Sequence, residues 1–134
     1  MSNNIVLLVA RILIAAIFII SGLQKFTAID GTAGYIASVG LPAATLLAWL
    51  SAIFETLAGV AILIGFFTRP AAWLLAAFCV VTGLFFHFDP ENQMQMVNFM
   101  KNLAMAGGFL ALAITGPGSI SVDARRGAAS PAIA

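Results

Sequence analysis

Residues 46–67 read LLAWLSAIFETLAGVAILIGFF, a long apolar stretch with one acidic residue, Glu55, near its middle. A helix needs about 20 mostly apolar residues to cross the hydrocarbon core of a bilayer. The stretch meets that length, and Gly65 lies close to its end. It therefore predicts a transmembrane helix.

Three further stretches have a similar length and character, and punctuation residues mark their ends. They are Ile5–Leu23, Ala71–Phe88 and Phe99–Thr115. Thr68-Arg69-Pro70 offers a hydroxyl cap and an early proline before the third helix, and Asp89-Pro90 ends it. Gly116-Pro117-Gly118 ends the fourth. The sequence thus predicts an all-α integral membrane protein, a bundle of four transmembrane helices.

The composition agrees with a membrane protein and excludes other classes. Of 134 residues, 62% are hydrophobic and 8% are charged, with a mean hydropathy of +1.08. Soluble domains average about 25% charged residues, so this chain lacks the polar surface that a globule in water requires. Disorder requires the opposite composition. With six Lys and Arg against five Asp and Glu, the chain is not an electrostatic nucleic-acid binder, and its partner is the lipid bilayer.

The connections between the predicted helices differ in character. The segment Thr27–Pro42 is too polar to span and has a short helical pattern, which predicts an amphipathic helix in the headgroup zone between the first and second spans. We expect residues 1–123 to form a single transmembrane domain. Residues 124–134 are predicted to be a flexible cytoplasmic tail.

The distribution of Lys and Arg predicts the orientation. Arg69, Arg125 and Arg126 fall on the same side as the N-terminus, whereas Lys25 and Lys101 fall on the other side. Cytoplasmic loops carry an excess of these residues. We therefore expect both termini on the inner side of the membrane, with Lys25 and Lys101 toward the outer side.

Ionisable residues within the spans are the candidate site residues, because a charge at the bilayer centre costs at least about 2.5 kcal/mol. Ala48, Ser51, Glu55 and Gly59 are three or four residues apart, so they share one face of the second span. Small residues favour contact between helices. Glu55 is therefore predicted to face the interior of the bundle.

The other three spans show the same arrangement, with each polar residue on a line of small residues. The lines are Arg11-Ala15-Phe18-Gly22-Lys25, Ala72-Ala76-Cys79-Gly83-His87 and Lys101-Ala104-Gly108-Ala111-Thr115. If all four lines face inward, the bundle has a narrow polar interior.

This interior supplies the candidate residues and leaves alternatives open. Glu55, Lys25 and Lys101 are the candidate catalytic residues, at the midplane and the outer end. Candidate binding residues are Arg11, His87, Asn102 and Ser51. In the structural alternative, Glu55 holds helices together, the lysines anchor helix ends, and Arg11 reaches toward Glu55 or toward the inner headgroups. No metal cluster is apparent, and a single histidine excludes a bis-His haem within one subunit.

Taken together, several motifs resemble the DoxX family of bacterial membrane proteins. They are the run from Arg11 to Lys25 with Ser21-Gly22, Glu55 and Gly59 followed by Gly65-Phe66-Phe67-Thr68-Arg69, Phe99-Met100-Lys101-Asn102-Leu103 with Gly107-Gly108, and Thr115-Gly116-Pro117-Gly118 with Ser121 and Asp123. The resemblance implies a four-helix protein of the bacterial inner membrane. It also implies membership of a class often labelled oxidoreductase. The residues that match positions of the family's sequence pattern are Arg11, Lys25, Glu55, Lys101 and Asn102.

Two functional hypotheses follow. The first is a subunit of a quinone-linked or stress-related membrane redox system, in which a lysine polarises an oxygen of a bound quinone or small anion and Glu55 exchanges a proton. No cofactor ligand set is evident, so electrons would pass through a bound quinone or flavin or through a partner subunit. The second is a non-enzymatic scaffold or a component of a small-solute permease. Self-association is expected to be favourable for so small and glycine-rich a bundle.

Overall fold

The computed structural model describes residues 2–127, and within them every regular element is a helix. The elements are α1 (Asn3–Thr27), α2 (Ile29–Ser38), α3 (Ala44–Ile64), α4 (Thr68–Thr82), the π-helical turn η1 (Gly83–His87), α5 (Gln93–Thr115) and α6 (Val122–Arg126). Four segments are long and apolar enough to cross a membrane: α1, α3, α4 with η1, and α5. The predicted all-α bundle of four spans is confirmed.

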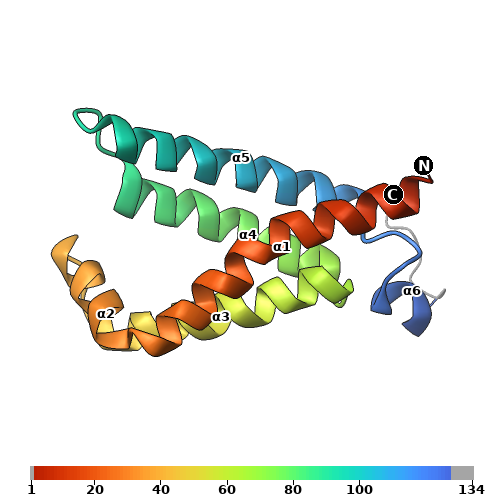
Figure 1. Ribbon diagram of the computed structural model, residues 1–134, viewed down its shortest axis with the longest axis horizontal. Helices are drawn as coiled ribbons and strands as arrows, with labels where there is room; N and C mark the ends of the chain where they lie inside the picture. Colours follow the sequence, from red (N-terminus) through yellow and green to blue (C-terminus); the bar gives the residue numbers. More distant parts are fainter. Residues whose placement is uncertain (1, 128–134) are drawn as a thin grey trace.

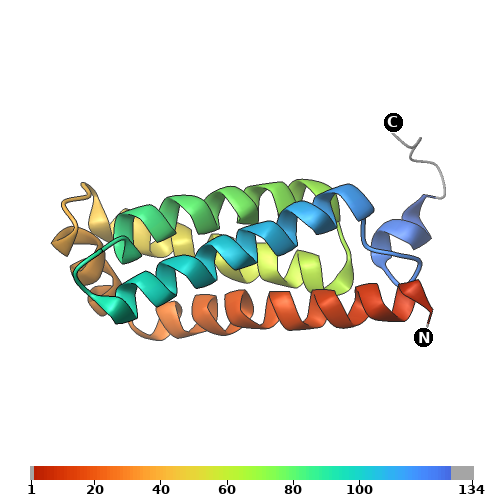
Figure 2. The same ribbon diagram turned by 90° about the horizontal axis from the view of Figure 1, so that it is seen from above.

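The four spans form two pairs, α1 against α3 and α4 against α5 (Figure 1). The pairs meet at the end of the bundle that carries the N-terminus and α6, which we call the terminus end. Toward the other end, where α2 lies, the pairs diverge, and we call this the α2 end. Seen from above, all four spans run roughly along one direction (Figure 2).

Glycines allow α1 and α3 to approach closely. A Cβ added to Gly22 would lie 2.8 Å from the backbone nitrogen of Thr56 and 3.0 Å from the carbonyl oxygen of Ala52. A Cβ on Gly59 would lie 2.9 Å from the side chain of Ile19. The line of small residues on each helix is therefore the contact surface, as in other close helix pairs in membranes.

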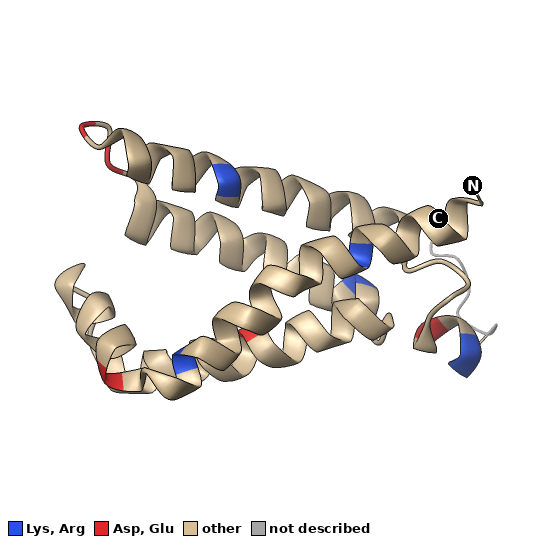
Figure 3. Cartoon of the chain, viewed as in Figure 1, with Lys and Arg blue, Asp and Glu red and all other residues tan. Residues whose placement is uncertain are grey.

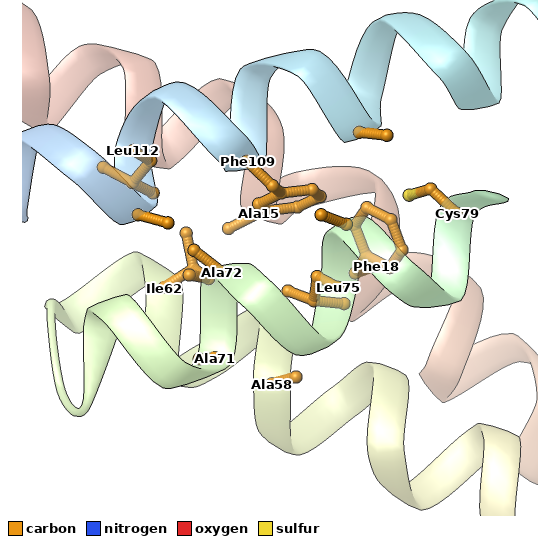
Figure 4. Close-up of a cluster of buried hydrophobic side chains, with 13 residues drawn as sticks. Ala15, Phe18, Ala58, Ile62, Ala71, Ala72, Leu75, Cys79, Phe109 and Leu112 are labelled. Carbon is orange, nitrogen blue, oxygen red and sulfur yellow. The ribbon is translucent and has the colours of Figure 1, made fainter.

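An apolar core closes the half of the bundle nearest the termini. Phe18, Leu75 and Phe109 are buried at its centre, and the rings of Phe18 and Phe109 meet edge to face at 5.3 Å between centroids (Figure 4). Ile62 and Leu112 close the cluster toward the terminus end. Because side chains from all four spans fill this half, any open space must lie toward α2.

At the α2 end, the short helix α2 packs against α3. Ala33 and Ile36 are buried against Ala48, and the Tyr35 hydroxyl donates a hydrogen bond to the Phe86 carbonyl oxygen at 3.1 Å. The predicted helix between the first two spans is therefore present. Its location in the headgroup zone stays a prediction.

The C-terminal segment folds back onto the terminus end. The Asp123 carboxylate accepts hydrogen bonds from the backbone N–H groups of Phe67 and Thr68, at 2.8 and 2.9 Å, and so caps α4. The backbone N–H of Ser119 donates to the Asn4 side chain at 2.9 Å. Val122–Arg126 is helical, so the first residues of the predicted flexible tail lie in α6, and residues 128–134 lie outside the described range.

Two details of the helix ends differ from the prediction. Thr68 does not cap α4 with its hydroxyl, because Asp123 supplies the capping oxygens and Thr68 is itself the first helical residue. The last span begins at Gln93 rather than Phe99, because the side chain of Asn92 caps it by accepting from the Gln95 backbone N–H. The polar first turns of α5 concealed this start.

The prediction that all four lines of small residues face inward is wrong for α5. Lys101, Ala104 and Thr115 are exposed, and α5 instead buries Phe109 and Ala113 on its opposite side. Small residues occur on both sides of this helix, so their spacing alone did not distinguish the two faces.

Candidate functional site

The diverging helix pairs enclose a cavity of about 910 Å³ in the half of the bundle nearest α2. Its walls come from α1, α2, α3, α4, η1 and α5, and most of the lining side chains are apolar. This volume is in the range of pockets that hold drug-sized ligands. The walls of such pockets are mostly apolar and carry a few precisely placed polar groups. The polar lining residues are Ser21, Lys25, Thr32, Tyr35, Ser51, Glu55, Cys79, Thr82, His87 and Asn102.

One wall of the cavity carries an ion pair between α1 and α3. The Lys25 ammonium lies 2.6 Å from Glu55 Oε2, and it also donates to the Ser21 hydroxyl at 2.8 Å. The Glu55 side chain is 7% exposed and the Lys25 side chain 25%, so the carboxylate lies deeper in the wall. The predicted inward orientation of Glu55 is what the structure shows, and Lys25 is its counterion.

The opposite wall carries an amide from α5 at the point where α4 passes into η1. Asn102 Nδ2 donates to the Cys79 carbonyl oxygen at 3.0 Å and to the Thr82 hydroxyl oxygen at 3.1 Å. Gly83 begins the π-helical turn, and a Cβ on it would lie 3.2 Å from Asn102 Cβ. Asn102 thus holds the helix transition, and π-helical turns are frequent at functional sites.

The remaining predicted binding residues on the cavity are His87 and Ser51. His87 Nδ1 lies 2.9 Å from Gln95 Oε1, which fixes the imidazole ring near the start of α5. The Ser51 hydroxyl donates to the Ala48 carbonyl oxygen one turn back in α3, at 3.0 Å. Both residues line the cavity, together with Lys25, Glu55 and Asn102.

Two predicted site residues lie away from the cavity. Lys101 is exposed on the outer face of α5, beside a shallow groove with Met96 and Met100. Arg11 is buried at the terminus end, where its guanidinium donates to the Ile120 carbonyl oxygen and packs against Gly65. Arg11 therefore binds the C-terminal segment, rather than Glu55 or the headgroups. At φ +70°, Gly65 also has a backbone conformation suited to glycine.

On η1, sequence reasoning identified His87, but it did not identify the other residues of α2, α4 and η1 that close the cavity. Tyr35 and Phe86 line it and stack with 5.2 Å between ring centroids, and Thr82 lines it beside Asn102. Tyr35 is the only tyrosine of the chain and lies on the predicted amphipathic segment, which was the one available signal. Among residues 2–127, no three His, Cys, Asp or Glu side chains are placed to hold a metal ion.

The basic residues of the loops and chain ends gather at one end of the bundle, where they outnumber the one acidic residue of that end, Asp123. Asp30, Asp89 and Glu91 belong to the α2 end, whereas Arg69, Arg125 and Arg126 belong to the terminus end (Figure 3). This arrangement agrees with cytoplasmic termini under the positive-inside rule. The cavity would then open toward the outer side of the membrane.

Comparison with known proteins identifies the family. The DoxX family model matches residues 6–88. The chain is similar to two proteins of Escherichia coli (strain K12): inner membrane protein YphA, at 44% identity over 92% of this chain and 92% of YphA, and inner membrane protein YqjF, at 42% identity over 90% and 92%.

A more distant relative is CatD of Bacillus subtilis (strain 168), whose name assigns it provisionally to the oxidoreductases. It is 35% identical over 52% of this chain and 50% of CatD. No solved structure matches the chain. By the family model and by two relatives that align over nearly their whole length, this chain belongs to the DoxX family of multi-pass bacterial inner-membrane proteins.

Proposed function

We propose that this chain is the quinone-binding subunit of a membrane redox system. The single observation that carries the proposal is the cavity of about 910 Å³ between the spanning helices, whose lining is mostly apolar and carries Lys25 with Glu55 on one wall and Asn102 with Thr82 on the other. A lipid-soluble quinone needs an apolar space for its ring and the start of its tail, and polar groups for its oxygens. A cavity between transmembrane helices offers both.

In this proposal, the residues of the first wall bind and polarise the headgroup. Lys25 makes hydrogen bonds to Ser21 and Glu55, and its third N–H is free to donate to a ligand oxygen. Reduction of a quinone to the quinol takes up two electrons and two protons; Glu55, beside Lys25, would pass one of these protons to the ligand on reduction and take it back on oxidation. The electrons would come from a partner subunit, because no residue set in the described part of the chain is suited to hold a metal ion.

The name of CatD supports a redox role only by association, since a shared fold does not establish a shared chemistry. The non-enzymatic alternative gains support from the Lys25–Glu55 ion pair itself, because a buried pair can serve only to hold α1 to α3. A path for small solutes is disfavoured by the apolar core, which fills the terminus half of the bundle.

The test is quinone binding by the purified full-length protein. Lipid extracts of detergent-purified protein are analysed for isoprenoid quinones and flavins, and the protein is then titrated with decylubiquinone. We expect a co-purified quinone and saturable binding. A preparation that carries no quinone and does not bind decylubiquinone would refute the proposal.

Matched variants separate the cavity from the rest of the membrane surface. The double variant Lys25→Met/Glu55→Leu removes both charges of the cavity wall and leaves neither partner unpaired. It should weaken decylubiquinone binding at least tenfold. Lys101→Met removes a lysine outside the cavity and should leave binding unchanged. Equal binding by both variants would favour the scaffold.

A further inference from the structure

Some of the polar groups that line the cavity can donate a hydrogen bond to a ligand, and others can only accept one. The balance of free donors and acceptors indicates which kind of ligand the cavity binds best. This inference rests on the proposed function, because it concerns the headgroup that would occupy the same cavity. Each side chain has a fixed number of donor hydrogens and acceptor lone pairs. The question is which of them the protein itself already uses.

The hydroxyl donors of the cavity are largely used within the protein. The Ser51 hydroxyl donates to the Ala48 carbonyl oxygen, that of Thr32 to the Ala28 carbonyl oxygen, and that of Thr82 to the Phe78 carbonyl oxygen, at 2.7 to 3.0 Å. The Tyr35 hydroxyl donates to the Phe86 carbonyl oxygen. In each of these four cases the hydrogen points at the backbone, and only lone pairs remain for a ligand. The fifth hydroxyl of the lining, that of Ser21, accepts from Lys25 and is hydrogen-bonded to the Glu55 carboxylate.

The nitrogen donors are also mostly used. Both N–H bonds of Asn102 Nδ2 have partners, the Cys79 carbonyl oxygen and the Thr82 hydroxyl oxygen. The Cys79 carbonyl can only accept, so it fixes the orientation of the amide and leaves Asn102 Oδ1 on the other side. Lys25 uses two of its three N–H bonds, for Ser21 and Glu55.

The acceptors, by contrast, remain free. Among the described residues, Asn102 Oδ1 accepts no hydrogen bond, and the Glu55 carboxylate, which binds Lys25 and the Ser21 hydroxyl, keeps further lone pairs on its two oxygens. The His87 Nδ1 atom is already occupied by its contact with the Gln95 side-chain oxygen, at 2.9 Å. The cavity is therefore rich in acceptors and has few donors.

We infer that the cavity selects the reduced form of its ligand, an aromatic diol, over the oxidised quinone. A quinone presents carbonyl oxygens, which can only accept, and the free N–H of Lys25 satisfies one of them. The diol presents two hydroxyl hydrogens, which the oxygens of Glu55 and Asn102 can accept from opposite walls. Oxidation removes both hydroxyl hydrogens of the ligand, so its hydrogen bonds to Glu55 and Asn102 are lost and the affinity falls.

The test compares the two oxidation states of one probe. The full-length protein in lipid nanodiscs is titrated anaerobically with ubiquinol-1 and with ubiquinone-1. We expect the dissociation constant of ubiquinol-1 to be about tenfold lower, the effect of one or two hydrogen bonds. By linkage, a tenfold preference raises the midpoint potential of the bound couple by about 30 mV.

Variants of Glu55 and Asn102 test whether these residues cause the preference. The measured quantity is the ratio of the dissociation constants of ubiquinone-1 and ubiquinol-1, because a general loss of affinity does not change this ratio. Glu55→Gln replaces an acceptor oxygen by a donor amide and should bring the ratio close to one. Asn102→Leu should also reduce it. Asn98→Leu lies one turn away on α5, outside the cavity lining, and should keep the native ratio.

The outcomes separate the two proposals. Equal affinities for the two forms in the native protein, or tighter binding of ubiquinone-1, would overturn the proposed selectivity. The proposal that the chain is a quinone-binding subunit would be unaffected. A native ratio in both Glu55→Gln and Asn102→Leu would also overturn it. Failure to bind either form would overturn the proposed function together with the selectivity.

Discussion

The side chains of Lys25 and Glu55 are held together across two helices, 30 positions apart in the chain. Removing one partner of a buried pair leaves a charge without compensation, whereas removing both is often nearly neutral. The stability of the protein therefore depends on keeping the two charges together, whatever further role the pair has with a ligand.

Glu55→Leu alone should lower the free energy of unfolding by about 3 kcal/mol, because it leaves the Lys25 ammonium unpaired inside the bundle. Lys25→Met/Glu55→Leu should recover most of that loss. Thermal unfolding of the two variants in one detergent measures the difference. Equal destabilisation by the single and the double variant would contradict the view that an unpaired Lys25 ammonium causes the loss.

Gly22 provides a second prediction for a single residue. Gly22→Ala introduces a Cβ against the backbone of α3 and should destabilise the protein by about 1 to 3 kcal/mol, the usual cost of overpacking. Gly107→Ala is the matched control on α5, because a Cβ there meets nothing within 4 Å. A thermal unfolding midpoint that falls for both variants by the same amount would contradict the close α1–α3 approach.

At the scale of the elements, the sequence predicted each span and the short helix between the first two, because apolar length and breaker residues are local signals. It also predicted the inward face of α3, where Ser51, Glu55 and Gly59 share one line. It could not choose the face of α5, since small residues lie on both sides of that helix. Lys101 was consequently assigned to the interior, although it lies outside.

The C-terminal segment could not be predicted for a different reason. Asp123 caps α4 from 55 positions away, and Arg11 binds the Ile120 carbonyl oxygen from the other end of the chain. No periodicity within a window of the sequence reports such contacts. The cavity likewise depends on the divergence of two helix pairs, which is a property of the assembled bundle.

Asp123→Ala should release the C-terminal segment from α4. The loss of a capping carboxylate costs about 1 kcal/mol, and the backbone N–H groups of Phe67 and Thr68 lose their acceptors. Hydrogen exchange of residues 117–126 should become faster, while exchange in α1 stays unchanged. Glu91→Ala, in the loop at the other end, is the control, and unchanged exchange in Asp123→Ala would contradict the capping role.

At the scale of the whole molecule, the orientation in the membrane decides which side the cavity serves. The excess of arginine at the terminus end predicts cytoplasmic termini. In a Cys79→Ala background, Glu91→Cys should react with a membrane-impermeant maleimide added to intact cells, and Ala124→Cys should react only after lysis. The reverse pattern would place the cavity toward the cytoplasm.

The account as a whole depends on occupation of the cavity by a quinone, and a cavity-filling substitution tests this most directly. Ser51→Phe places a ring in the cavity, whereas Ala104→Phe places the same ring on the exposed face of α5. The measurement is the amount of quinone extracted per mole of purified protein. We predict close to one quinone per chain for the native protein and for Ala104→Phe, and a large loss for Ser51→Phe. An unchanged quinone content in folded Ser51→Phe, or none in the native protein, would contradict the central claim.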